Sequence, residues 1–491
     1  AAAMGPPRAL PRGLPQLLLR GARAAPPLPR RPLWVPGRPL STLQAAGEQC
    51  ATEVTTLPSG MRVASQRTTD ETLTVGVWID AGSRFETQEN NGTAHFLEHM
   101  AFKGTRRRNR IQLEKEIENM GGHLNAYTSR EQTVYYAKVF KDDLKQGVDI
   151  LSDILSNSTL DQAHLEFERG VILREMEEVE KTVEEVIFDR LHLTAFHGSP
   201  LSYTILGPVE NIQSITKQQL RDYVQSHYTA DRMVIAAAGP VDHQELVQEA
   251  EERFRFFKPR SAAGGIEPEP TPTFCGAELL YRTDEEPDAL AHFAVGYEGV
   301  PWTHPDSITF MVMQSIIGSY KRGEGLVPPK LSGNRLTNNL ANNLGPVAAE
   351  SFAAFNTCYK DTGIFGFYGQ CEEAAVPGCV DELLFGVASL ARSVTEEEVE
   401  RGKRQLKTTL FGSLDSTTAI AEDIGRQLLV YGRRMPTSEL LLRVDAVDAA
   451  GVKRVARERL WDADIALTAL GPLGALPRLE ELRRRTGARR L

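Results

Sequence analysis

Three residues within one five-residue segment, His95, Glu98 and His99, are the group in this chain best suited to metal chemistry. On a helix, side chains four positions apart project from one face, so both imidazoles can reach the same ion. Glu98 lies one position before the second histidine, where it can hold a water molecule beside that ion. The order H-x-x-E-H, the inverse of a common zinc-protease signature, therefore predicts a hydrolytic metal site. The alternative is a helix whose two histidines are solvated or packed in a core.

A hydrolytic zinc site needs a third protein ligand from a separate element and one open position for water. The apolar spacing of residues 165–176 predicts a helix that carries Glu168 and Glu175. These two glutamates are seven positions apart and share one helix face, so either can approach the histidines.

Further segments of the chain carry a family resemblance, from about residue 50 to near the end and most densely before residue 240. With Glu175 placed 76 positions after His99, they resemble the pitrilysin/insulinase family of metallopeptidases, and within it the mitochondrial processing peptidases. The resembling segments are 57–65, 76–80, 91–105, 124–133, 171–176 and 422–427.

The resemblance implies one zinc ion per chain, bound by His95, His99 and Glu175. Glu98 is then the general base, which takes a proton from the attacking water and later delivers it to the leaving amine. Glu168 fits a supporting role, in which it orients a ligand histidine or tunes the charge around the metal. A solvated surface glutamate is the alternative for Glu168.

Other positions match residues that bind substrate in processing peptidases. Glu185 and Asp189 match two acidic residues that bind an arginine upstream of the cleaved bond, since paired carboxylates can clamp a guanidinium. Phe102 matches the position that receives the aromatic side chain after the cut. An acid-rich solvated helix face and a plain core phenylalanine are the respective alternatives. The edge strand that pairs with an extended substrate is matched by Asn125, Ala126 and Tyr127.

The composition changes along the chain. Residues 1–42 contain seven arginines, no lysine and no acidic residue, which predicts a mitochondrial targeting peptide with a cleavage site near 38–41; a disordered basic tail is the alternative. Without those seven arginines, the 56 basic residues fall to 49 against 65 acidic ones. This acidic body disfavours nucleic acid and suits a cationic peptide. The sequence has no uninterrupted apolar run of 18 residues, so no membrane-spanning helix is expected. Its five cysteines include no C-x-x-C pair, which predicts free thiols.

The two halves of the chain echo each other across a Pro/Gly-rich stretch at 259–274, which we interpret as a linker. Segments 168–170 and 235–240 recur 232 positions later, and 73–82 resembles 290–299 at a shift of 217. These repeats predict a catalytic lobe at 50–258 and a second lobe of the same fold at 275–480. The shifts put residues without metal chemistry in the places of the ligands and base, so the second lobe is expected to bind no metal. These residues are Val312, Ser315, Ile316 and Lys407.

Each half mixes strand-like alternation with amphipathic helices, which predicts an α+β fold with a mainly antiparallel sheet covered by helices on one face. The resemblance implies two such lobes facing across a cleft. Strands are expected at 74–80, 123–129, 133–140 and 233–238. Helices are expected at about 89–104, 108–121, 141–157, 161–196, 216–228 and 243–255.

The resemblance implies a zinc endopeptidase subunit that removes targeting peptides from proteins imported into the mitochondrial matrix. In this family a glycine-rich loop of an alpha-type subunit recognises the presequence, and this chain has no such run of glycines. We therefore expect an alpha-type partner of the same fold. The alternative function is a core subunit of the ubiquinol–cytochrome c reductase (cytochrome bc1) complex on the matrix side of the inner membrane, acting structurally or in both roles. Intact His95, Glu98, His99 and Glu175 favour the peptidase.

Overall fold

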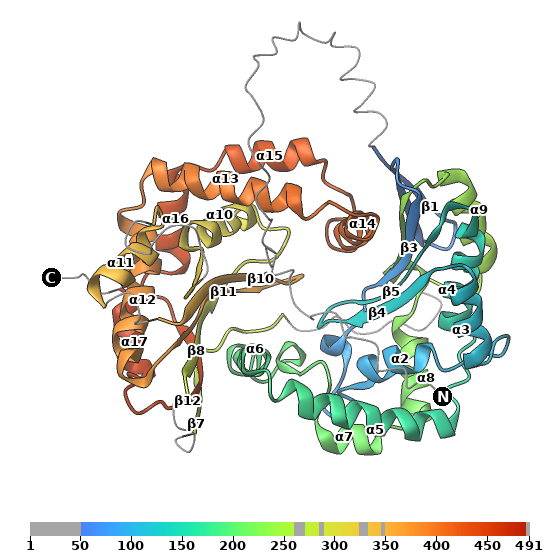
Figure 1. Ribbon diagram of the computed structural model, residues 1–491, viewed down its shortest axis with the longest axis horizontal. Helices are drawn as coiled ribbons and strands as arrows, with labels where there is room; N and C mark the ends of the chain where they lie inside the picture. The colour runs from blue at the N-terminus through green and yellow to red at the C-terminus, as the bar shows by residue number, and fades with distance from the viewer. Residues whose placement is uncertain (1–50, 260–270, 284–288, 324–331, 345–348, 488–491) are drawn as a thin grey trace, which may run out of the picture. The chain divides into compact units, whose positions relative to one another are not determined.

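The computed structural model describes residues 51–259, 271–283, 289–323, 332–344 and 349–487 (Figure 1). The expected targeting peptide at 1–42 and most of the expected linker lie outside these residues.

The first half of the chain forms a six-stranded sheet in the order β1-β2-β6-β3-β5-β4. β2 and β6 run parallel, and the other neighbours pair antiparallel. The four expected strands are confirmed to within two residues, whereas β1 and β2 were not expected. The strands are β1 (Thr52–Thr56), β2 (Arg62–Arg67), β3 (Thr72–Ile79), β4 (His123–Thr128), β5 (Thr133–Phe140) and β6 (Met233–Gly239).

Helices cover one face of this sheet and form a common core with its strands. Alternation in β3 explains the arrangement: Val75, Val77 and Ile79 enter this core, while Trp78 points to the opposite face. The helices are α2 (Thr93–Ala101), α3 (Arg110–Asn119), α4 (Leu144–Ser156), α5 (Gln162–Val179), α7 (Val209–Ser214), α8 (Lys217–His227) and α9 (His243–Arg253).

The expectation of one helix over 161–196 is wrong. α5 ends at Val179, and a separate helix, α6 (Val183–Ala195), follows after a tight turn. In that turn the N–H groups of Lys181 and Thr182 donate to carbonyls three residues earlier, so the helical ladder is not continued. Neither proline nor glycine marks the break, which is why the sequence pattern did not reveal it.

The second half repeats the sheet in the order β7-β12-β8-β11-β10-β9. β7 and β12 run parallel, as β2 and β6 do, and the other neighbours pair antiparallel. The expectation of two related α+β lobes is confirmed. We call the first sheet with its helices the first lobe and the second sheet with its helices the second lobe. The strands are β7 (Glu278–Arg282), β8 (Ala291–Glu298), β9 (Ser319–Lys321), β10 (Ser351–Cys358), β11 (Gly363–Cys371) and β12 (Ile465–Gly471).

One repeat is displaced by a residue from its expected register. Thr74 pairs with Ala238, and His292 pairs with Leu470, so β3 corresponds to β8 at a shift of 218 rather than 217. A slip of one residue would send every side chain to the wrong face. The observed shift keeps Val75 and its counterpart Phe293 in their lobes' cores.

The second lobe also buries its helices against one face of its sheet. Residues Glu373–Arg392, which include α12, are long and apolar enough to cross a membrane, but 61% of that window is buried within the protein. The helices of this core are α10 (Ser307–Ile317), α11 (Arg335–Asn343), α12 (Val376–Arg392), α13 (Glu396–Gly412), α15 (Thr437–Asp445), α16 (Ala449–Arg459) and α17 (Leu479–Thr486). One more helix, α14 (Thr417–Tyr431), follows α13 but does not join this core.

The lobes exchange one helix each, which the sequence did not predict (Figure 1). α6 of the first lobe packs on the second sheet, where Ile187 and Leu191 meet Ala294 and Ile364. Reciprocally, α14 of the second lobe packs on the first sheet, where Ile424 and other apolar residues meet Trp78. Each sheet is therefore covered on its second face by a helix from the other lobe, and burial of these apolar side chains joins the lobes.

Ion pairs reinforce the contact between the lobes. Buried Arg84 of the first lobe donates to both carboxylate oxygens of Asp361 in the second lobe, at 2.9 and 2.6 Å. Its guanidinium also bonds to Glu131, 2.6 Å away, and Glu131 accepts from the Lys360 backbone N–H at 3.0 Å.

Trp78 occupies the centre of the contact with α14. A Cβ on Gly76 would lie 2.8 Å from its indole ring, and a Cβ on Gly425 of α14 would overlap the ring. Both glycines thus leave the space that the indole fills.

We predict that Gly425→Ala destabilises the protein by about 1–3 kcal/mol, because the added methyl group overlaps the Trp78 ring. Gly412→Ala is the matched control, since a Cβ there meets nothing within 4 Å and alanine favours a helix by about 0.5–1 kcal/mol. Urea denaturation measures both changes. Equal stability of the two variants would contradict the role assigned to Gly425.

Candidate metal centre

The helix that carries the histidines is fixed at its start by a distant carboxylate. α2 begins after Gly92, which adopts a left-handed conformation with φ of 105° and has no side chain to cap the helix. Glu86 fills this role and accepts from the N–H groups of Gly92 at 2.8 Å and Ala94 at 2.6 Å. Burial raises the pKa of Glu86 to about 8, against the opposing effect of these hydrogen bonds. By accepting from these N–H groups, the buried Glu86 side chain holds the start of α2 in place.

His95, His99 and Glu175 converge as the sequence predicted. The Glu175 Oε2 atom lies 3.6 Å from His95 Nε2 and 3.0 Å from His99 Nε2. The two imidazole rings meet edge to face with centroids 4.7 Å apart. His95 is completely buried, whereas His99 and Glu175 keep part of their surface exposed.

This donor set fits a divalent metal ion. One nitrogen from each histidine and one oxygen of the glutamate lie within 4.8 Å of one another. In a tetrahedral site with zinc–ligand distances of about 2.0–2.2 Å, ligand atoms are about 3.3–3.6 Å apart. The separations of 3.0 and 3.6 Å bracket that range, so small side-chain shifts would complete the geometry. Among the residues that the structure describes, this is the one group of three with that property.

Glu168 lies on the other side of the His99 ring, at 3.2 Å from Nδ1. A carboxylate can only accept, so this contact keeps a proton on Nδ1 and directs the Nε2 atom toward Glu175. Lys103 completes the arrangement through an ion pair of 2.7 Å with the other oxygen of Glu168. The Glu168 side chain is 2% exposed, so it is not a solvated surface glutamate.

The local electrostatics favour positive charge between the helices. Burial lowers the pKa of His99, but the hydrogen bonds that its ring donates to Glu168 and Glu175 outweigh burial and raise this pKa to about 9. Burial raises the pKa of Glu168, but His99 and Lys103 outweigh it and hold that pKa below its usual value. Two carboxylates that stabilise a proton on the imidazole also stabilise a metal cation in its place.

The remaining candidates on α2 and its neighbours lie near this group. Glu98 lies on the same turn of α2 as the histidines and is 8% exposed. Phe102 caps the end of α2, and its partly exposed ring packs edge to face on Tyr135 with centroids 6.4 Å apart. This contact is that of a residue at the rim of the core.

Asn125, Ala126 and Tyr127 lie on β4, which is an edge strand of the first sheet. The Ala126 N–H donates to the side chain of Asn125 at 2.8 Å. In the second lobe the corresponding strand, β10, is paired along its outer edge by β9. The edge available in the first lobe is therefore occupied in the second.

Glu185 and Asp189 were expected on the same helix as Glu175, but they lie on α6, beyond the break after α5. They share one face of that helix, one turn apart. Asp189 already pairs with the buried Arg130, whose Nη2 lies 2.6 Å from its Oδ1. A guanidinium from a substrate would have to share this carboxylate with Arg130.

The positions expected to replace the ligands lie on α10 and α13, the counterparts of α2 and α5. Val312 and Ile316 are buried in the core of the second lobe. Lys407 pairs with Asp445 on α15. Glu400, the counterpart of Glu168, pairs with Lys403 at 2.6 Å.

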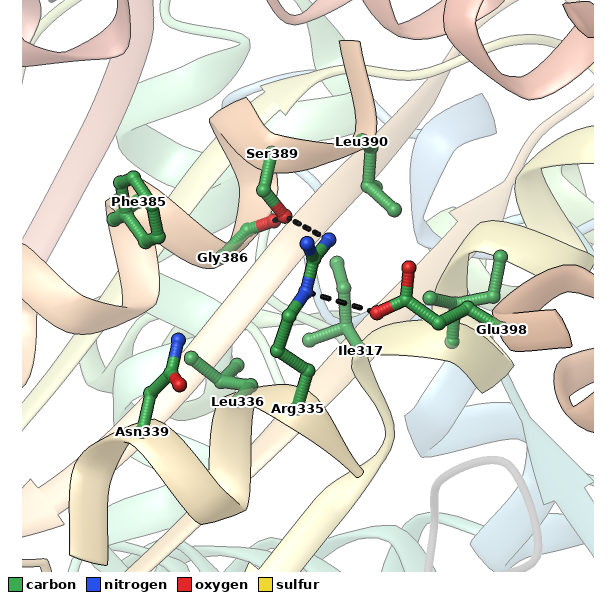
Figure 2. A pocket seen from close by; sticks show the side chains of 10 residues that line it. Ile317, Arg335, Leu336, Asn339, Phe385, Gly386, Ser389, Leu390 and Glu398 are labelled. Carbon is green, nitrogen blue, oxygen red and sulfur yellow. Dashed lines mark hydrogen bonds and ion pairs between the residues drawn. The ribbon is translucent and has the colours of Figure 1, made fainter. Parts of the chain in front are cut away.

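A cavity of about 20 Å³ lies beside these helices (Figure 2). Arg335 lies across it, at 2.9 Å from the Ser389 hydroxyl and 2.8 Å from the Glu398 carboxylate. A space of this size holds about one water molecule, and its charged groups are paired with each other. It is therefore not a substrate site.

Sequence reasoning missed Glu86 and Lys103. Glu86 caps a helix from six residues before Gly92, outside the three-residue spacing of a capping box. Lys103 lies one turn after His99, a spacing that could have indicated a contact near the metal face.

Residues 62–209 match the family described as Insulinase (Peptidase family M16), and residues 214–406 match the one described as Peptidase M16 inactive domain. The chain belongs to peptidase family M16. The family is one of metallopeptidases, which agrees with the His95, His99 and Glu175 cluster and confirms the resemblance found in the sequence.

Curated relatives are named as mitochondrial-processing peptidase subunits. The chain is 51% identical over 442 residues to "Probable mitochondrial-processing peptidase subunit beta, mitochondrial" of Arabidopsis thaliana, covering 89% of this chain and 81% of the relative. It is 49% identical over 462 residues to "Mitochondrial-processing peptidase subunit beta" of Mus musculus, covering 92% of each. A protein of that name from Lentinula edodes is 51% identical over 435 residues, with 87% of this chain and 91% of the relative covered.

Among solved structures, the fold is similar to a chain of "Complex III2 from Candida albicans, Inz-5 bound". The TM-score is 0.78 at 24% identity, over 88% of this chain and 99% of that chain. This likeness concerns the fold alone.

We predict that Glu168→Gln weakens zinc binding about 10- to 100-fold, because the neutral amide holds the His99 imidazole less firmly. Glu166→Gln is the matched control, since Glu166 lies on the same helix but is exposed and pairs with Arg169. Competition with a chromogenic chelator measures both affinities. Unchanged affinity in Glu168→Gln, or an equal loss in Glu166→Gln, would contradict this role.

Proposed function

We propose that this chain is the zinc-binding subunit of an endopeptidase that removes N-terminal targeting peptides from proteins imported into the mitochondrial matrix. The observation that carries the proposal is the convergence of His95, His99 and Glu175 on one point beside Glu98. The beta-subunit names of relatives at 47–51% identity support the same substrate class. We further propose residues 1–42 as the chain's own targeting peptide, 50–258 as the catalytic lobe, 259–274 as a linker and 275–480 as a lobe without catalytic residues.

One zinc ion per chain would be held by the two imidazoles and the Glu175 carboxylate. When bound, such an ion supplies Lewis-acid polarisation of the scissile carbonyl and of the attacking water.

The chain's own residues then move the proton. Glu98 lies on the face of α2 that carries both histidines, and its partial burial limits competition from bulk water. Its carboxylate accepts a proton from the attacking water and returns it to the nitrogen of the leaving amine. Glu168 keeps the proton of His99 on Nδ1 throughout, so that Nε2 stays available.

The substrate would be held as an added strand along β4. No strand pairs with the outer edge of β4 among the described residues. An extended peptide can form main-chain hydrogen bonds there without regard to its side chains. This suits an enzyme whose substrates differ widely in sequence. We propose that Phe102, at the end of α2, contacts the residue after the cut.

Specificity for arginine upstream of the cut is assigned to Glu185 and Asp189. The two carboxylates lie one turn apart on α6, so one oxygen from each can bind the same guanidinium. Arg130 holds Asp189 in place through one oxygen and leaves part of that side chain exposed.

The first prediction from this proposal concerns the base. Glu98→Gln should keep the metal but lower kcat by several orders of magnitude, because an amide cannot accept the proton. Cleavage of a presequence peptide and zinc content are measured on the same preparation. Near wild-type cleavage by Glu98→Gln would refute the assignment. His95→Ala, as a contrasting variant, should lose the metal itself.

The second prediction concerns the arginine. With Glu185→Gln and Asp189→Asn combined, kcat/KM should fall for a peptide with the upstream arginine and change little for the same peptide with citrulline. The coupling should be about 1–3 kcal/mol, as for other charge-assisted contacts. The comparison between peptides cancels any general damage from leaving Arg130 without its partner. Equal losses for both peptides would assign these carboxylates to structure alone.

The third prediction concerns a partner. The chain supplies a metal site and an edge strand, but its second lobe has no metal ligands at the corresponding positions and its sequence has no glycine-rich loop. An alpha-type subunit of the same fold would supply that loop and a second wall, which reduces the ordering cost of a flexible presequence. Mixing experiments with purified subunits should give activity only when both are present. Full activity of the isolated chain would contradict this expectation.

The alternative role, a structural core subunit of the cytochrome bc1 complex, requires neither the metal ligands nor Glu98. Native purification distinguishes the two assignments by whether a second processing-peptidase subunit or cytochrome subunits accompany the chain.

A further inference from the structure

One residue of the second lobe, Glu422, reaches the strand that we assign to substrate. It lies on α14, in the exchanged helix, and both of its carboxylate oxygens are used. Oε2 accepts from the indole N–H of Trp78 on β3 at 2.9 Å, and Oε1 accepts from the hydroxyl of Tyr127 on β4. A single carboxylate thus joins the second lobe to the centre and to the edge of the first sheet.

The edge strand lies between two helices of different origin. Ala126 faces the core of the first lobe, which includes residues of α2. Tyr127 faces the opposite side and packs with Trp78, Tyr136 and residues of α14. β4 therefore has the metal-binding helix on one face and the second lobe on the other, while β5 pairs one of its edges.

Further contacts fasten α14 to the first sheet beside Glu422. Gly425 lies one turn after Glu422 and lets α14 approach the Trp78 ring closely. The start of α14 is held by hydroxyl contacts of Thr74 with Thr417 and Thr418, each at 3.0 Å. Burial, and then the Glu422 carboxylate, raise the pKa of Tyr127 well above its usual value, so its hydroxyl keeps the proton that it donates.

We infer that Glu422 is a positioning residue through which the second lobe holds β4 in place for pairing with an extended substrate. The inference rests on the proposed function and gives the lobe without metal ligands a part in it. Glu422 acts through Tyr127 and Trp78 rather than on the metal ligands.

The test uses the assembled enzyme with its partner and zinc, and three variants: Glu422→Gln, Tyr127→Phe and both together. Each single change should lower kcat/KM for a presequence peptide by about tenfold or more, since displacement of a binding strand misaligns the substrate. KM should carry most of the loss, and zinc content and the pH dependence of kcat should not change. Because both changes remove the same contact, the double variant should lose no more than the more affected single variant.

Asp423→Asn is the matched control. Asp423 is adjacent on α14 and carries the same charge, but it pairs with Arg434, which bonds to Thr52 of β1 and Gln66 of β2. The Asp423→Asn substitution therefore weakens the attachment of the same helix without touching β4, and it should leave kcat/KM near the wild-type value. If Glu422→Gln does not fold, Tyr127→Phe still decides, because phenylalanine keeps the ring and removes only the hydroxyl.

Three results would overturn the inference: wild-type kcat/KM in Glu422→Gln and Tyr127→Phe, additive losses in the double variant, or an equal loss in Asp423→Asn. The proposed function fails separately, if the wild-type assembly itself does not cleave the peptide, and the inference then fails with it.

Discussion

The placement of His99 between two glutamates of α5 is the contact on which the site depends. Glu175 faces its Nε2 atom at 3.0 Å and Glu168 faces its Nδ1 atom at 3.2 Å. These glutamates are seven positions, or about two turns, apart on α5, and the His99 ring of α2 lies between them. The contact fixes the orientation of the imidazole, the approach of α5 to α2 and the excess of negative charge that a metal ion would neutralise. Lys103, which follows α2, adds an ion pair to Glu168 of α5, and Glu86 caps the start of α2.

The exchanged helices give each lobe a structural role in the other. The first sheet would leave Trp78 and its neighbours exposed without α14, and the second sheet would leave Ala294 and Ile364 exposed without α6. Each lobe thus completes the other's second sheet face, so loss of either would expose apolar surface in the one that remains. This dependence is independent of catalysis. The support that α14 gives to the first sheet therefore requires no metal in the second lobe.

Much of the fold and the site could be predicted from local pattern. The i, i+4 spacing of the histidines and the shared face of Glu168 and Glu175 depend only on helix geometry, and the structure brings these four side chains together. Strand alternation likewise located β4 and β5 to within a residue.

The features that sequence did not reveal depend on contacts between distant segments. The break between α5 and α6 carries no proline or glycine, and α6 leaves α5 to pack on a sheet more than 90 residues later in the chain. The pairing of Asp189 with Arg130, and the reach of Glu422 to Tyr127, join residues that no periodicity relates. The one-residue slip in the repeat arose because similar letters do not define the face on which a strand residue lies, whereas its pairing does.

The central claim is that one zinc ion is bound between α2 and α5 by two imidazoles and one carboxylate. X-ray absorption spectroscopy at the zinc edge of the purified chain tests it directly. The account predicts a first shell of nitrogen and oxygen atoms at about 2.0–2.2 Å, with the outer scattering of two imidazole rings and no sulfur. In Glu175→Ala the shell should lose an oxygen ligand or the metal altogether. A sulfur shell at about 2.3 Å, or a spectrum that Glu175→Ala leaves unchanged, would contradict the account.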